Sequence, residues 1–152
     1  MTLVLDTSYT LPNVGIEVRN LPVLWLPGQQ TGKDVDLAGV NGSLARPRFL
    51  TSTVRTLELV VYGRGPITGS GATAAECLEL NVEWLRDLVY PVSSSDGTRD
   101  AVLTLPSGAT LEGPVHLLGL SFGQVAPHGK WALATMDVNI PGGELARVEV
   151  AP

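Results

Sequence analysis

The sequence has little of what many catalytic or metal-binding proteins need. Aromatic residues make up 5% of its 152 residues, and Cys77 is its single cysteine. One cysteine cannot form a disulfide within the chain, and no spacing of cysteine and histidine resembles a zinc site. We therefore expect no cofactor, no metal and no dependence on an oxidising compartment, with synthesis in a cytoplasm.

Runs of basic residues and long apolar runs are also missing. The formal net charge is −5, and lysine and arginine occur as isolated residues. This pattern disfavours specific binding of nucleic acid or of an anionic membrane. The N-terminus has no basic region before Asp6, so it is not expected to be a signal peptide, and no stretch reaches the roughly 18 to 20 apolar residues that span a bilayer.

What remains is an aliphatic, turn-rich composition. Hydrophobic residues make up 44% of the chain, with 17 glycines and 11 prolines spread along it. Such a chain favours many short elements joined by turns. We predict a single domain over 1–152 of mainly β (α+β) class: an antiparallel β-sandwich-like domain with one packed α-helix. Residues 1–50 are expected to form an extended, irregular arm with some strands, and 51–152 the sheet and helix core.

The alternation of apolar and polar residues predicts the strands. In 54–62, Leu57, Leu59 and Val61 point to one face, which should be core. Asn41-Gly42 is typical of a hairpin turn, and 28–34 of a polar loop. Strands are expected at 14–18, 23–26, 54–62, 101–105, 110–120, 131–140 and 145–150.

One helix is expected over 72–90, because Thr73 and Glu76 have capping-box spacing and Pro91 follows. Its apolar arc is wider than one sheet requires. We therefore hypothesise that Trp84, Leu88 and Leu80 lie at a contact between subunits. The alternative is that N-terminal segments of the same chain cover this surface.

A small basic cluster before the main strand is a second candidate contact. Arg46 and Arg48, with Arg55 nearby, could pair with carboxylates of a neighbouring subunit. The alternative is a solvated strand edge.

No catalytic constellation emerges from the remaining candidates, and we expect no enzyme. His116 and His128 lack metal-ligand neighbours, and Ser121 lacks the preceding glycine of a nucleophile elbow. Cys77, on the apolar flank of the helix, is expected to pack as a small hydrophobe. The glycines of 63–71 lack a phosphate-binding motif and are interpreted as a connection between strand and helix.

The order of these features resembles the distal tail proteins of long-tailed bacteriophages. The likeness is carried by 41–48, by the strand 53–63, by the helix 74–88, by the hairpin 101–108 and by the closing strand 131–141. It implies a structural protein of the virion, made in the host cytoplasm and assembled as a hexameric ring that joins the tail tube to the tip hub. The implied partners are further copies of the chain, the tube protein and the tip or hub protein. Larger members carry a C-terminal β-sandwich, which is not expected here because the chain stops at Pro152.

Two other readings stay open at this point. Tail tube and tail terminator proteins also combine sheets, a helix and extended arms in rings; a tube protein should form long polymers. A carbohydrate-binding module is a different class, which exposed aromatic residues at loop ends would favour.

Overall fold

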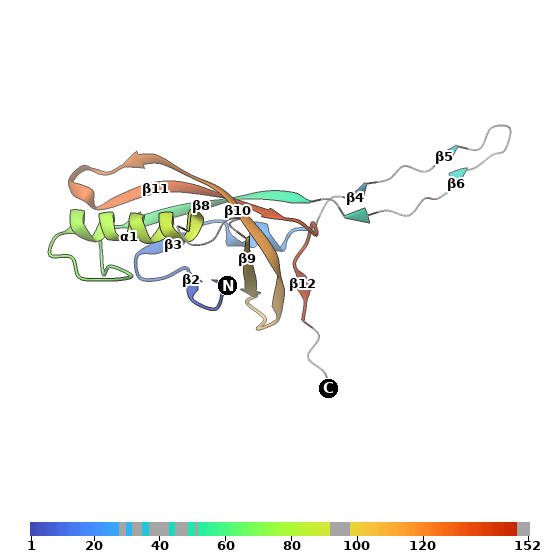
Figure 1. Cartoon of the computed structure of the whole chain (residues 1–152), viewed down its shortest axis with the longest axis horizontal. Helices are drawn as coiled ribbons and strands as arrows, with labels where there is room; N and C mark the ends of the chain where they lie inside the picture. The colour runs from blue at the N-terminus through green and yellow to red at the C-terminus, as the bar shows by residue number, and fades with distance from the viewer. Residues whose placement is uncertain are drawn as a thin grey trace.

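The computed structural model describes residues 1–27, 30–31, 35–36, 43–44, 49–50, 52–91 and 98–148. Its main body is an antiparallel sheet with one α-helix on one face (Figure 1), as the sequence predicts. The strands lie in the order β2-β1-β9-β10-β11-β8-β3, and β12 also pairs with β10. They are β1 (Thr2–Leu5), β2 (Tyr9–Leu11), β3 (Ile16–Val18), β8 (Thr53–Tyr62), β9 (Thr98–Thr104), β10 (Thr110–Val125), β11 (Trp131–Ile140) and β12 (Ala146–Arg147).

The centre of the sheet follows from the alternation in β8 and β11. In β11, every second residue from Ala132 to Ile140 is at most 4% exposed, and the first three of these residues pair with buried residues of β8. Leu57, Leu59 and Val61 are likewise buried, as predicted. Both strands therefore present one apolar face to the core and one more polar face outward.

The helix α1 (Ala74–Val89) begins where the capping box predicts. The Glu76 backbone N–H donates to Thr73 Oγ1 at 3.2 Å, and the Thr73 N–H donates to Glu76 Oε2 at 3.3 Å. Pro91 lies two residues beyond the end of α1. The helix buries Cys77, Leu78, Asn81, Leu85, Leu88 and Val89.

One expectation about the N-terminal region was wrong. Residues 23–26 are not a strand, because Leu21–Trp25 form the 3-10 helix η1, with Pro22 in its first turn and Leu24 packed into the core. Other N-terminal strands join the main sheet: β1 pairs with β9, β3 pairs with β8, and Leu3 and Leu5 are buried.

Two short antiparallel pairs lie beyond the end of the main sheet (Figure 1). They are β4 (Gln30–Thr31) with β7 (Phe49–Leu50), and β5 (Val35–Asp36) with β6 (Ser43–Leu44). The predicted turn at Asn41-Gly42, most of the predicted loop at 28–34, and Arg46 and Arg48 lie outside the described residues.

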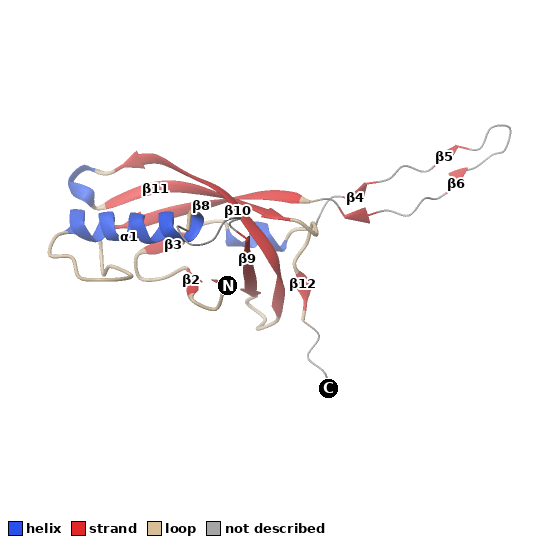
Figure 2. Ribbon diagram, viewed as in Figure 1, coloured by secondary structure: helices blue, strands red, loops and turns tan. Residues whose placement is uncertain are grey.

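β10 differs most from expectation, because it runs five residues further than 110–120 and serves two neighbours. Its first part, Thr110 to His116, pairs with β9, and its second part, from His116 to Val125, pairs with β11. Figure 1 shows it as a long curved ribbon that crosses between these two parts of the sheet. The short helix η2 (Pro127–Gly129) follows it and contacts α1 (Figure 2).

Candidate assembly surfaces

The second part of β10 forms an open edge of the sheet. Beyond His116, where the pairing with β9 ends, β10 pairs only with β11 among the described strands. On this stretch the backbone N–H of Leu120 donates to the Tyr90 hydroxyl at 3.0 Å. Such an edge offers backbone donors and acceptors to a strand from another chain.

Apolar side chains accompany this edge. Leu118 is 48% exposed, Phe122 40% and Val125 58%, and Tyr90 at the end of α1 is 52% exposed. Phe122 lies opposite Ala134, a buried residue of β11, so it is on the face that α1 covers further in. We call Tyr90, Leu118, Phe122 and Val125 the β10 edge patch. Apolar residues gathered along the open edge of a strand are typical of an interaction surface.

The face of the sheet opposite α1 carries carboxylates. The Tyr62 hydroxyl donates to Glu17 Oε2, and the Thr56 hydroxyl donates to Asp137 Oδ1, both at 2.6 Å. Glu58 lies on the same face, since it pairs across from an exposed position of β11. The hydrogen bond to Glu17 raises the pKa of Tyr62, with burial and the Glu17 charge adding to the shift. This face also carries Val54, Trp131 and Leu133, and Arg19 and Arg64 lie near Tyr62, so it is mixed in character, with carboxylates among apolar and basic residues.

The expected helix contact is only partly available. Leu88 is 0% exposed and packs in the core of its own chain, so its assignment to a subunit contact was wrong. Trp84 is half-buried, and its ring lies 5.6 Å from that of Tyr9 in β2. The N-terminal region thus covers part of the wide apolar arc, as the alternative proposed. Leu80 is partly exposed. A contact of Leu80 or Trp84 with another subunit stays a prediction.

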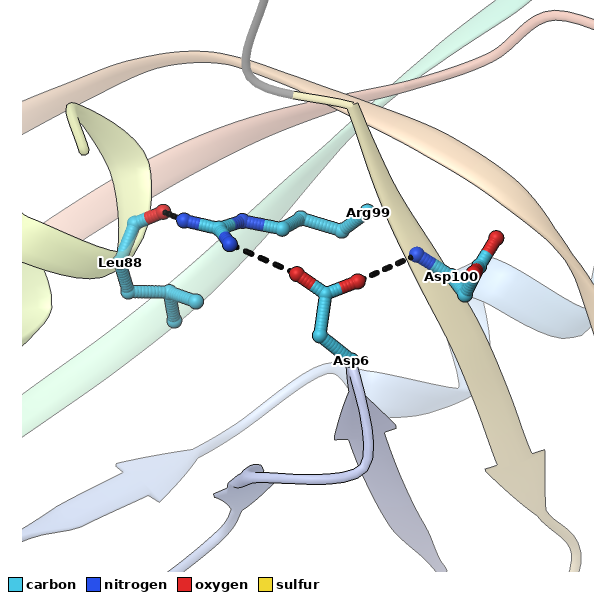
Figure 3. Close-up of polar contacts among 4 residues, drawn as sticks. All are labelled: Asp6, Leu88, Arg99 and Asp100. Carbon is cyan, nitrogen blue, oxygen red and sulfur yellow. Dashed lines mark hydrogen bonds and ion pairs between the residues drawn. The ribbon is translucent and has the colours of Figure 1, made fainter. Parts of the chain in front are cut away.

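A charged cluster fastens this N-terminal region to the end of α1 (Figure 3). Arg99 Nη1 lies 2.6 Å from Asp6 Oδ2, and Arg99 Nη2 donates to the Leu88 carbonyl at 2.9 Å. The Asp100 backbone N–H donates to Asp6 Oδ1 at 2.8 Å. Partial burial would raise the pKa of Asp6, but the hydrogen bonds from Arg99 and Asp100 and the Arg99 charge together hold it below its usual value.

The sequence offers few candidates for catalysis or metal binding, among them Cys77, Ser121 and His128. No group of three or more His, Cys, Asp or Glu that could hold a metal occurs in the described part of the chain. Cys77 is buried, and its thiol lies 3.7 Å from the Gly71 carbonyl oxygen. Ser121 is an exposed residue of β10, and His128 lies in η2. None of the described helices is long and apolar enough to cross a membrane.

Comparison with known proteins rests on the structure, because no family model and no curated protein matches the sequence. The structure of this chain is similar to the crystal structure of SPP1 Dit (gp 19.1), a paradigm of the hub adsorption apparatus in phages that infect Gram-positive bacteria. The TM-score is 0.58 at 17% identity, over 93% of this chain and 50% of that chain. This chain shares its fold with half of SPP1 Dit. The resemblance to phage distal tail proteins is therefore confirmed for the fold, and the chain spans half the length of its structural neighbour.

The sequence predicts the buried faces of the sheet but not its exposed edge. The buried side of β8 and β11 was readable from alternation. The β10 edge patch was missed, because Leu118 and Phe122 look like the core residues of any strand. Only the pairing of β10 with a single neighbour beyond His116 shows that they are exposed.

Proposed function

We propose that this chain is a structural subunit of a phage tail, and that its copies form a distal ring between the tail tube and the tail tip or hub. The fold shared with SPP1 Dit supports a role in a tail. The open edge of β10, together with the β10 edge patch, is the observation that supports assembly into a ring. A fully paired sheet would have left no such edge to bury.

The contact between copies is head-to-tail. The β10 edge patch of one copy packs against the opposite edge of the sheet in the next, near β3, where Val14 is 56% exposed. A contact between two different surfaces closes into a ring when the rotation between copies allows it, and otherwise grows into an open filament. We propose closure at six copies, as the resemblance implies.

The carboxylate-bearing face of the sheet suits the wall of a passage for DNA. Three carboxylates, of Glu17, Glu58 and Asp137, lie on it beside two arginines, and the carboxylates repel the phosphate backbone. This distribution agrees with a net charge of −5 and with the expectation that the chain does not bind nucleic acid specifically.

The mass of the purified chain in solution, measured by light scattering over a concentration series, tests the proposal. We expect a discrete species of six subunits. Phe122→Lys should convert it to monomers, because a charge in the contact would be buried without a partner. Val54→Lys is the matched control: Val54 is 54% exposed at the far end of β8, and its replacement should leave the ring intact.

Other results would point elsewhere. Open-ended polymers would favour a tail tube protein over a distal ring. A chain that stays monomeric, both alone and when mixed with tail tube and hub proteins, would contradict ring assembly. A hexamer that Phe122→Lys leaves unchanged would show that the β10 edge patch is not the contact between copies.

A further inference from the structure

A hollow of about 370 Å3 lies between η1 and β12, away from the β10 edge patch. Its walls include Trp25 and Leu26 from the end of η1, and Leu145 and Arg147 from the segment that contains β12. Trp25 is 58% exposed, the largest exposed fraction of any aromatic side chain among the described residues. An open indole beside a concave surface is unusual in a chain with so few aromatic residues.

The segment that presents Trp25 is held at both ends by β8. Before η1, Asn20 Nδ2 donates to the Thr56 carbonyl at 2.8 Å, and Asn20 Oδ1 accepts from the Glu58 N–H at 2.7 Å. After η1, Arg55 Nη2 donates to the Pro27 carbonyl at 2.9 Å.

Arg55 reaches this position at a cost, because its Nε is buried without a hydrogen-bond partner among the described residues. The Trp25 indole is therefore carried by a backbone segment that is held at both ends by hydrogen bonds to β8. A rigid platform reduces the entropy lost when a ligand binds.

Three kinds of surface meet in the hollow. Its floor is aliphatic: Leu24, Leu111 and Leu145 are at most 8% exposed. Its wall is the indole. At its rim lie two exposed charged residues, Arg147 and Glu144.

We propose that this hollow binds an N-acetylated amino sugar. The C–H face of a pyranose ring packs on the Trp25 indole, as apolar faces do on aromatic rings. The acetamido methyl group contacts the leucine floor, and the guanidinium of Arg147 donates hydrogen bonds to the sugar oxygens. An apolar methyl group next to hydroxyls matches an aliphatic floor next to a charged rim. A plain hexose has no acetamido methyl group to contact the leucine floor. This inference is independent of ring assembly.

Isothermal titration of the full chain with chitotriose, the trimer of N-acetylglucosamine, tests the proposal. Cellotriose, the glucose trimer, is the matched ligand without acetamido groups. We expect saturable binding of chitotriose and affinity for cellotriose lower by about tenfold or more. Trp25→Ala should lower the chitotriose affinity by about tenfold or more, and Trp25→Phe by less. Trp131→Ala, which removes a half-buried tryptophan on the opposite side of the sheet, should bind as the wild type does.

The melting midpoint of each variant, followed by circular dichroism, separates lost binding from lost folding. Absence of binding at about 10 mM chitotriose would overturn the proposal. Equal affinity for the two trisaccharides would overturn the role of the leucine floor and with it the choice of ligand. If Trp25→Ala folds and still binds chitotriose as tightly as the wild type, the sugar is not in this hollow. If instead only attachment to a tail protein is lost, the hollow is a protein contact and the proposal is wrong.

Discussion

Replacing Arg99 with methionine removes the centre of the cluster that ties the turn after β1 to the end of α1. The Arg99 side chain is 9% exposed and that of Asp6 32% exposed. Methionine fills similar space but donates nothing to Asp6 or to the Leu88 carbonyl. It also removes the guanidinium from the Tyr9 ring, whose centroid lies 5.4 Å away.

The expected loss of stability follows from these contacts. Breaking a buried ion pair costs about 3–5 kcal/mol, but here we expect about 2–3 kcal/mol. Two features reduce the loss. Asp6 is accessible enough to be rehydrated. The Nε of Arg99 has no partner among the described residues, so part of the desolvation cost of the arginine is not offset in the wild type.

The pH dependence gives a second, independent readout. The pKa of Asp6 is lowered from 3.8 in the folded chain, so its contribution is complete above that value. This contribution is lost as the pH falls through the folded pKa. The stability difference between wild type and Arg99→Met should therefore be largest near neutral pH and shrink as the pH falls below 3.8.

Guanidinium unfolding at several pH values measures both effects. Asp6→Asn is the companion variant, since it keeps the shape of the side chain and removes the titrating group. It should be less stable than the wild type near neutral pH and should lose less stability on acidification. If Arg99→Met were within about 0.5 kcal/mol of the wild type near pH 7, the cluster would not stabilise the fold and the reasoning would be refuted.

Two further changes are expected to act through single polar groups. Asn81 is 0% exposed and bonds to three backbone groups, so Asn81→Ala should cost about 2–4 kcal/mol in a urea titration; a loss below 1 kcal/mol would show that water replaces the amide. Thr73→Ala removes the cap of α1 and should cost about 1 kcal/mol by the same measurement, whereas Thr73→Ser should be nearly neutral. Equal losses in the two Thr73 variants would contradict the capping role.

Much of the fold was predictable because local patterns dominate it. The alternation in β8 and β11 follows from one buried face, and β11 has the predicted bounds, 131–140. The start of α1 was readable because the Thr73 and Glu76 capping box acts within a single turn. By contrast, Val23 to Leu26 has the composition of a strand but lies mostly in the 3-10 helix η1. There the backbone conformation is set by Pro22 in the first turn and by the packing of Leu24 into the core.

The candidate surfaces were harder to predict, because exposure depends on which strands become neighbours. Leu88 and Phe122 are both large apolar residues in amphipathic segments. The first is sealed in the core, and the second lies at an open edge. Trp25 is similar: the sequence shows a tryptophan in an apolar stretch, and only the tie between η1 and β8 turns its ring outward.

By itself, the sequence determined the class of the protein: a mainly antiparallel sheet with one capped helix, without the residue patterns of a metal site or a common catalytic triad. These properties depend on periodicity and composition, which act over a few residues. The tertiary structure decided what covers the helix, which strand is left with one neighbour and where the acidic residues gather. Those outcomes depend on pairing between segments as far apart as Asp6 and Asp100 or Glu17 and Tyr62. No local pattern specifies such pairs, because their energies exist only once the chain has brought them together.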